Sequence, residues 1–341
     1  MLLRKLALPL LFATLTAAQV APCTEATVAC REPVHLGADG RFVAVYRSFA
    51  LTRPNQGLRL AYIMIHGSGR NADHYFSTAL ASTFLAGRLS DTLVLAPRFA
   101  GNDGLRCKDA LEPGEIGWNC NGWVAGERAA DDSPVHSYDL IDRLLEMLAN
   151  REVFPNLKRI VLAGHSAGGQ FGNRYAAAGR GPTSLPVPIH YVVSNPSSYL
   201  YLESVRPAAG AKCTEKGDCA GGFTAFADAA KCEGYNRWRY GLEKRSGYTA
   251  SLEEKDLRSQ LASREVTYLL GALDTLPIGG FDSSCAAMAQ GSTRLERGLA
   301  YWNYVKSRLS ASHRLVTVPM CGHNGRCMFT ADQALRAVFS D

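Results

Sequence analysis

The stretch that decides the fold reads Arg159-Ile160-Val161-Leu162-Ala163-Gly164-His165-Ser166-Ala167-Gly168-Gly169. Its apolar residues from Ile160 to Ala163 are typical of a strand buried on both faces. Ser166 then stands between Gly164 and Gly168 in the G-x-S-x-G pattern of a nucleophile elbow, a sharp strand-to-helix turn where glycine avoids Cβ clashes. Gln170 to Ala178 can continue as a helix. The alternative is an ordinary loop of glycine and serine after a buried strand.

Composition favours one large domain. The chain has 341 residues, of which 47% are hydrophobic, and no shift in composition demands a second core. The net charge is +6, but Lys and Arg are scattered and aromatic residues do not interleave with basic clusters. Nucleic acid is therefore not expected as a partner.

Residues 1–18 are expected to be a signal peptide. Arg4 and Lys5 precede the apolar stretch from Leu6 to Leu15, and Thr16-Ala17-Ala18 is a small-residue site compatible with cleavage. The apolar stretch is shorter than the about 20 residues of a membrane span, and no later segment is uninterrupted enough to be one. We expect a secreted or periplasmic protein after cleavage.

A lipoprotein is the alternative, because Cys23 follows closely. Pro22, however, stands where a lipid-attachment site requires a small residue. We expect residues 19–41 to form a short leader.

The ten cysteines all lie beyond the signal peptide, and an even count in an oxidising compartment predicts disulfides. Their connectivity does not follow from sequence, although sequence-local pairs close loops at low entropic cost: Cys23 with Cys30, Cys107 with Cys120, and Cys321 with Cys327. No C-x-x-C pair or H-E-x-x-H motif occurs, so a metal site is not expected.

Strand-like and helix-like segments alternate along the chain. Apolar and β-branched runs predict strands over 42–51, 58–65, 92–96, 189–194, 266–270 and 315–318. Spaced apolar residues predict helices over 137–149, with Ser137 as N-cap, over 294–309 and over 331–339. The alternation predicts an α/β fold with a mostly parallel sheet and helices on both faces.

Two long stretches interrupt this alternation, at about 101–132 and 199–263. Both contain cysteines, and loops of such length in a compact domain are usually functional. We expect a single catalytic domain over 42–341 with these two insertions.

A serine nucleophile needs a general base and a group that orients the base. Asp274 follows the predicted strand 266–270, and His323 follows the strand 315–318, which gives the order Ser, Asp, His of this type of site. Asp282 is the reserve candidate for the acid. Histidines that compete with His323 are His165, which sits inside the elbow, His136 and His190.

Two backbone amides are expected to bind a developing oxyanion. One is the amide of Ala167, at the positive end of the helix after the nucleophile. The other is the amide of Ser68, in the glycine-rich segment His66-Gly67-Ser68-Gly69 after a strand, where the backbone can approach a substrate closely.

These residues together resemble the α/β-hydrolase superfamily, over most of the chain from about Phe42 onwards. The segment from His66 to Asp73, with Tyr75-Phe76, looks like the oxyanion segment of secreted polyhydroxyalkanoate depolymerase and feruloyl esterase relatives. Those enzymes often carry a different small residue in place of Ser68. Tannase-type relatives have cysteines beside the serine and the histidine, whereas this chain has His165 and Asn324. The resemblance implies the α/β-hydrolase fold, ester hydrolysis outside the cell membrane, and no metal or organic cofactor.

The expected activity is that of a serine carboxylic ester hydrolase, an esterase or a polyester depolymerase, working through a Ser166–His323–Asp274 triad. Loop aromatics Tyr75, Trp118 and Trp123 are expected to supply apolar contact to the substrate, although buried tryptophan in a disulfide-tied loop can equally be scaffold. The alternatives are a serine peptidase with the same triad and a non-catalytic binding protein.

Overall fold

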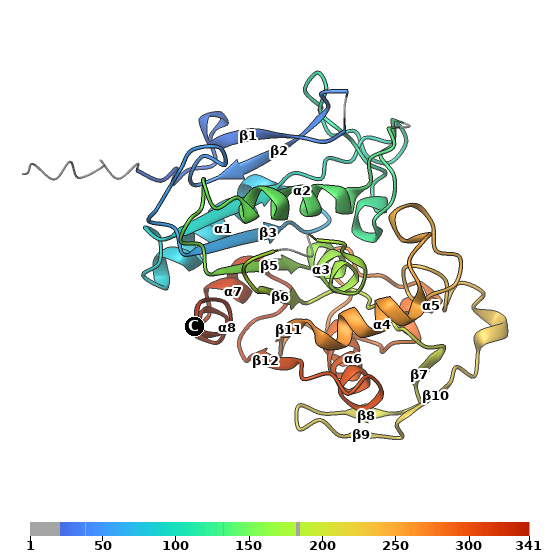
Figure 1. Ribbon diagram of the computed structural model, residues 1–341. Helices are drawn as coiled ribbons and strands as arrows, with labels where there is room; N and C mark the ends of the chain where they lie inside the picture. The colour runs from blue at the N-terminus through green and yellow to red at the C-terminus, as the bar shows by residue number, and fades with distance from the viewer. Residues whose placement is uncertain (1–20, 38, 132, 182–184, 341) are drawn as a thin grey trace, which may run out of the picture.

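The computed structural model describes residues 21–37, 39–131, 133–181 and 185–340 (Figure 1). The predicted signal peptide, residues 1–18, lies outside the described residues. A central sheet of eight strands has the order β1-β2-β4-β3-β5-β6-β11-β12. Its strands are β1 (Arg31–His35), β2 (Phe42–Arg47), β3 (Leu60–Ile65), β4 (Thr92–Pro97), β5 (Arg159–His165), β6 (Ile189–Ser194), β11 (Glu265–Gly271) and β12 (Arg314–Val318).

The direction of the strands confirms the predicted mostly parallel sheet. Every neighbouring pair from β4 to β12 is parallel. Only β1 and β2, at one edge, pair in the antiparallel sense. The parallel strands therefore end at one common edge, where the loops that follow them meet.

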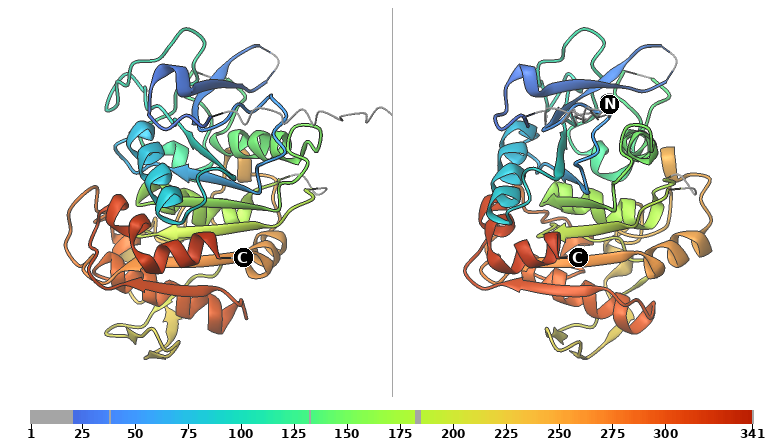
Figure 2. Two further views of the ribbon diagram at one scale, coloured as in Figure 1. Left: turned by 90° about the vertical axis from the view of Figure 1, so that its left-hand side faces the viewer. Right: turned by 60° about the vertical axis from the view of Figure 1, so that its left-hand side comes forward.

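Helices cover both faces of the sheet (Figure 2). One face is covered by α1 (Ala72–Leu85), α7 (Gly325–Thr330) and α8 (Asp332–Phe339). The other is covered by α2 (Ser137–Ala149), α3 (Ala167–Ala178), α4 (Glu254–Ser263) and α6 (Arg294–Arg308).

Alternating side chains of the central strands explain why both faces are covered. In β3, Ala61, Ile63 and Ile65 belong to the core under α2 and α3, whereas Tyr62 and Met64 belong to the core under α1 and α8. Successive side chains of a strand point to opposite faces, so a strand that is apolar at every position must be buried on both.

The two predicted insertions contain short elements and meet each other. The remaining elements are η1 (Val28–Cys30), η2 (Gly122–Ala125), β7 (Val205–Pro207), β8 (Lys212–Cys213), β9 (Cys219–Ala220), β10 (Phe223–Ala225), η3 (Ala229–Lys231), η4 (Gly247–Thr249) and α5 (Cys285–Met288). The indole N–H of Trp238 donates to the carbonyl of Ala125 at 2.8 Å, which joins the second insertion to the first.

All ten cysteines are paired in five disulfides. The three sequence-local pairs that were expected are formed: Cys23–Cys30, Cys107–Cys120 and Cys321–Cys327. Two further pairs, Cys213–Cys219 and Cys232–Cys285, lie in or next to the second insertion. These bonds tie the long insertions to themselves and to α5.

Several predicted boundaries differ from the structure. The strand predicted over 42–51 ends at Arg47, and the helix predicted over 294–309 ends at Arg308. The N-cap of α2 is His136 and not Ser137, because the amide of His136 donates to the carboxylate of Asp139 at 2.7 Å and closes the first turn. The leader range 19–41 contains β1, which was not predicted.

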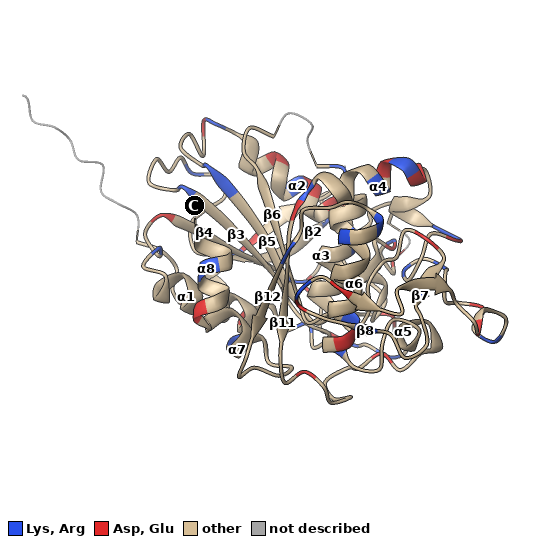
Figure 3. Cartoon of the chain, turned by 90° about the horizontal axis from the view of Figure 1, so that it is seen from below, with Lys and Arg blue, Asp and Glu red and all other residues tan. Residues whose placement is uncertain are grey.

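Charged residues show no segregation by sign in the view of Figure 3, where Lys and Arg alternate with Asp and Glu over the helices and loops. In the part of the chain that the structure describes, no helix is long and apolar enough to cross a membrane.

Candidate active site

Ser166 occupies a strained turn between β5 and α3. Its backbone has φ 58° and ψ −115°, a conformation that L-residues rarely adopt. The flanking glycines make the turn possible: a Cβ at Gly164 would overlap the carbonyl of Gly168, and a Cβ at Gly168 would overlap the carbonyl of Ile65. The G-x-S-x-G segment is therefore an elbow in the structure, as its pattern indicates.

The structure brings Ser166, His323 and Asp274 into one chain of hydrogen bonds. The imidazole Nε2 of His323 lies 2.9 Å from Ser166 Oγ, and its Nδ1 lies 2.8 Å from Asp274 Oδ2. Asp274 follows the carboxyl end of β11 and His323 follows that of β12. A carboxylate only accepts, so His323 Nδ1 carries the proton and Nε2 accepts from the serine hydroxyl.

Asn195 was not predicted as a site residue, yet it joins the acid and base loops. Its amide Nδ2 donates to Asp274 Oδ2 at 2.7 Å and to the carbonyl of Gly322 at 3.2 Å, and its Oδ1 accepts from the amide of Gly271 at 3.0 Å. Asn195 is buried and has a φ of 45°. Its position directly after β6 was the available sequence signal, because this is the same edge at which the other site residues lie.

The other oxygen of Asp274 faces a buried cation. The Nη1 atom of Arg294, at the start of α6, lies 3.4 Å from Asp274 Oδ1, and both side chains are at most 2% exposed. Sequence analysis placed Arg294 only within a helix and gave it no role.

The amide of Ser68 is oriented by the peptide group it belongs to. The Gly67 carbonyl accepts from the amide of Arg70 at 3.0 Å and from His66 Nδ1 at 2.9 Å. Because the C=O and N–H of a trans peptide point in opposite directions, the Ser68 N–H points away from these donors. It has no acceptor among the residues that the structure describes.

The two predicted amides lie on adjoining segments. A Cβ on Gly67 would stand 3.7 Å from that of Ser166, so the loop after β3 passes beside the elbow. Ala167 is the first residue of α3, where helical amides have no intrahelical acceptor. The loop that contains Ser68 and the first turn of α3 therefore both lie beside Ser166.

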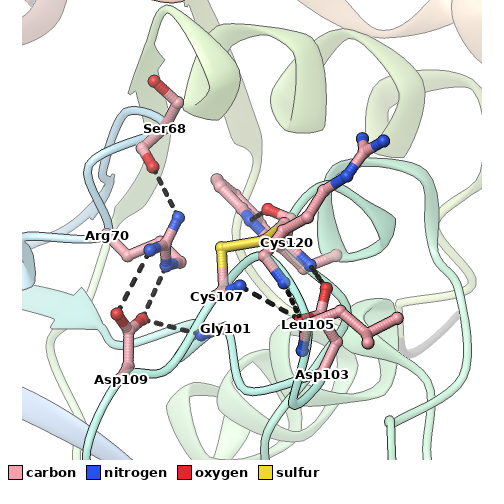
Figure 4. Close-up of a disulfide and its surroundings, with 10 residues drawn as sticks. Ser68, Arg70, Gly101, Asp103, Leu105, Cys107, Asp109 and Cys120 are labelled. Atoms are coloured by element: carbon pink, nitrogen blue, oxygen red, sulfur yellow. Dashed lines mark hydrogen bonds and ion pairs between the residues drawn. A yellow bond between two sulfur atoms is a disulfide. The ribbon is translucent and has the colours of Figure 1, made fainter.

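The first insertion is attached to this loop through Arg70 (Figure 4). The guanidinium donates to both oxygens of Asp109, at 2.6 and 3.1 Å, and to the carbonyl of Ser68 at 2.8 Å. Asp109 also accepts from the amide of Gly101 at 2.8 Å. The disulfide Cys107–Cys120 closes the same part of the insertion, so the position of Ser68 depends on a segment held by an ion pair and a covalent bond.

His66 is a structural histidine behind this loop. Its Nε2 accepts from the amide of Phe99 at 2.9 Å, so the proton resides on Nδ1 and is donated to Gly67. Burial lowers the pKa of His66 to about 4, because a charged imidazole would lack water there. The residue is therefore neutral at physiological pH.

The structure places Trp118 and Trp123 in the scaffold. Both are fully buried and pack in an aromatic cluster with Phe99, from which their ring centroids lie 5.4 and 5.2 Å. A side chain without exposed surface has no access to a substrate, which corrects the expectation that these tryptophans provide apolar contact.

Tyr75 also points inward, from α1. Its hydroxyl lies 2.9 Å from Nδ1 of His165 and close to Gly67, so it connects α1, the elbow and the loop after β3. His165 is buried, and its ring centroid lies 4.7 Å from that of His323. Burial, followed by the neighbouring His323 and Arg294, lowers the pKa of His165 well below its ordinary value.

The reserve acid, Asp282, is not in contact with His323. Its carboxylate accepts from the hydroxyl of Tyr240 at 2.7 Å and from the amide of Ser284 at 3.0 Å. The structure therefore brings Asp274, and not Asp282, to the imidazole.

Comparison with known proteins agrees with this fold. The profile of the alpha/beta hydrolase family matches residues 62–339, and the chain belongs to this family. No curated protein matches the sequence significantly.

Two solved structures illustrate the similarity. The poly(3-hydroxybutyrate) depolymerase LpqC from Bordetella parapertussis superposes with a TM-score of 0.58 at 21% identity, covering 89% of this chain and 89% of that one. The poly(aspartic acid) hydrolase-1 from Sphingomonas sp. KT-1 has a TM-score of 0.57 at 21% identity and covers 91% of this chain and 98% of that one. At this level of identity the likeness establishes the shared fold.

Proposed function

We propose that this protein is a serine hydrolase that cleaves carboxylic esters through an acyl-enzyme on Ser166. The observation that carries the proposal is the unbroken hydrogen-bonded chain from Ser166 Oγ through both nitrogens of His323 to Asp274. A serine hydroxyl is a weak nucleophile, and this arrangement supplies the base and the orienting carboxylate that it requires.

The first half of the reaction forms the acyl-enzyme. Ser166 Oγ attacks the ester carbonyl while its proton passes to His323 Nε2, and the imidazolium is stabilised by Asp274. The tetrahedral intermediate collapses when the C–O bond breaks and His323 returns the proton to the leaving alkoxide. An alcohol departs and the acyl group stays on the serine.

The second half releases the acid. His323 takes a proton from a water molecule, whose oxygen attacks the acyl carbonyl, and then protonates Ser166 as the acyl group leaves. In both halves the amides of Ala167 and Ser68 donate to the oxyanion, which is where preorganised donors contribute most. The protein's own residues account for each proton transfer, and the proposed reaction requires no cofactor.

Exposed apolar side chains that are near Asp274 and His323 in sequence support an ester with apolar groups as the substrate. They are Leu273 (54%), Leu276 (61%), Ile278 (56%) and Met320 (81%). Exposed apolar side chains gain free energy when a substrate covers them. We therefore propose esters with an apolar acyl or alcohol part, either as small molecules or as polyester chains.

A serine peptidase of the same fold is the second candidate, since the triad would serve it equally well. The discriminating experiment compares p-nitrophenyl esters of increasing acyl length with chromogenic peptides. Ester turnover that is lost in Ser166→Ala and kept in Ser307→Ala, an exposed serine on α6, supports the proposal. Peptide cleavage with negligible ester turnover contradicts it, and equal activity of Ser166→Ala indicates a non-catalytic site.

The proposed location is outside the cytoplasm. Five disulfides and the signal-like residues 1–18 support export. N-terminal sequencing of the protein from the periplasm and the medium tests this, because export predicts a mature chain that begins near residue 19.

A further inference from the structure

Arg294 lies where a cation is electrostatically unfavourable. It is the first residue of α6, at the positive end of the helix dipole, and its side chain is 0% exposed. Burying a charge is costly unless its hydrogen bonds are satisfied. A guanidinium in such a place must have its hydrogen bonds supplied by the groups around it.

The guanidinium uses every nitrogen. Nε donates to Ser197 Oγ at 2.7 Å, Nη1 faces Asp274 Oδ1 at 3.4 Å, and Nη2 donates to the carbonyls of Ile278 and Gly279 at 2.7 and 3.0 Å. The side chain of Arg294 thus contacts both the carboxylate of Asp274 and the loop 275–281. A Cβ on Gly279 would stand 3.0 Å from His323 Cδ2, so this loop lies directly against the imidazole.

The charge of Arg294 is also close to the reacting groups. Asp274 shares its two oxygens between His323 on one side and Arg294 on the other. The carboxylate is therefore held from both sides while His323 exchanges its proton with Ser166. Arginine stays charged throughout the working pH range.

We propose that Arg294 is a positioning residue that fixes the Asp274 carboxylate and the loop 275–281 against the imidazole of His323. This inference rests on the proposed function of the triad. Because Asp274 in turn orients His323, loss of Arg294 is expected to lower turnover more than substrate binding.

The other groups that face His323 do not supply a second cation. From the end of β5, His165 packs against its ring, and burial lowers the pKa of His165 so that it is neutral. Tyr75, on α1, reaches His165 and is also neutral, because burial raises its pKa. The remaining contacts are the Ser166 hydroxyl, the loop at Gly279 and the carboxylate of Asp274.

Arg297 provides a matched control on the same helix. It is likewise fully buried, and it donates to the carbonyls of Ser197 and Asp282, beside the same loop, without touching Asp274. Both guanidiniums pack on the ring of Phe281, at 5.1 and 4.3 Å. Substitution of Arg297 therefore disturbs the same region without removing the charge next to the acid.

The test compares kcat and KM for a p-nitrophenyl ester in three variants. In Arg294→Gln kcat is expected to fall about 10- to 100-fold with KM little changed, because Asp274 and the loop lose the donor that they share. Arg294→Lys keeps a cation next to Asp274 and is expected to recover part of this kcat. In Arg297→Gln kcat is expected to change by less than about threefold, because the contacts of Asp274 stay in place.

The outcomes separate the inference from the proposed function. If Ser166→Ala is inactive but the kcat of Arg294→Gln is unchanged, or falls equally in Arg297→Gln, the inference is wrong and the proposed function stands. If Ser166→Ala keeps full activity, both fail. Where Arg294→Gln does not fold, as judged by its urea unfolding curve, Arg294→Lys still decides, because a raised KM with an unchanged kcat contradicts a positioning role.

Discussion

Acidification is predicted to destabilise the protein through His66, the buried histidine behind the loop after β3. His66 has a folded-state pKa of about 4, lowered by burial from the ordinary value of 6.5. Between these two values the unfolded chain binds a proton that the folded chain does not. The contribution of neutral His66 to the free energy of unfolding is therefore complete above pH 6.5 and is lost as the pH falls toward 4.

The magnitude follows from the difference of 2.5 between the two pKa values. Linkage gives a loss from His66 of about 2 kcal/mol at pH 5 and about 3 kcal/mol at pH 4, relative to pH 8. Other buried histidines add to the loss in free energy of unfolding of the wild type, notably His190, where burial lowers the pKa to about 3. The contribution of His66 is therefore isolated by comparing variants.

The assay is urea unfolding followed by tryptophan fluorescence at pH 8 and pH 5, with the disulfides intact. His66→Gln has no titrating group at this position. Between pH 8 and pH 5 its free energy of unfolding is expected to fall by about 2 kcal/mol less than that of the wild type. His74→Gln, at an exposed position on α1 with 75% of its side chain accessible, is the control and is expected to behave as the wild type. An unchanged pH dependence in His66→Gln would refute the reasoning.

The remaining predictions concern the groups around the triad. Asn195→Ala removes a hydrogen bond to the Asp274 carboxylate and is expected to lower kcat by about 10- to 100-fold with KM little changed, as measured by ester kinetics; an unaltered kcat contradicts this. Tyr75→Phe leaves His165 without its hydroxyl partner and is expected to cost about 1–3 kcal/mol in urea unfolding. Replacing Cys107 and Cys120 by serine together opens a loop with a sequence separation of 13 and is expected to cost about 3 kcal/mol; unchanged unfolding curves would show that the first insertion is held by other contacts.

The residues that sequence analysis identified have one property in common. Ser166, Asp274 and His323 each follow the end of a predicted parallel strand, and such ends must gather at one edge of the sheet. Their order and the glycine spacing of the elbow are local features, so they can be seen without knowing any contact.

Asn195 and Arg294 could not be identified in the same way. An asparagine after a strand is typical of an ordinary turn. Arg294 begins a helix on which Arg297 is also buried, whereas the remaining charged residues are exposed. The roles of Asn195 and Arg294 depend on contacts with Asp274, which is 79 and 20 residues away in sequence. Burial of an arginine is set by tertiary packing, and residue type alone argues against it.

The edge of the sheet illustrates the same limit. Only Val34 of β1 is buried, so the alternation that identifies a strand is too weak to detect in 31–35. The tryptophans of the first insertion show the converse. A tryptophan can line a pocket or lie in the core, and only the packing against Phe99 shows that these two lie in the core.

The measurement that tests the central claim most directly is covalent labelling of the purified protein with a fluorophosphonate, followed by mass spectrometry of the digested chain. Activation of Ser166 by His323 and Asp274 predicts one modified peptide, the one that contains Ser166, and no labelling of Ser166→Ala. Absence of label on the folded wild type, or equal labelling of the alanine variant, would contradict the assignment of Ser166 as the nucleophile.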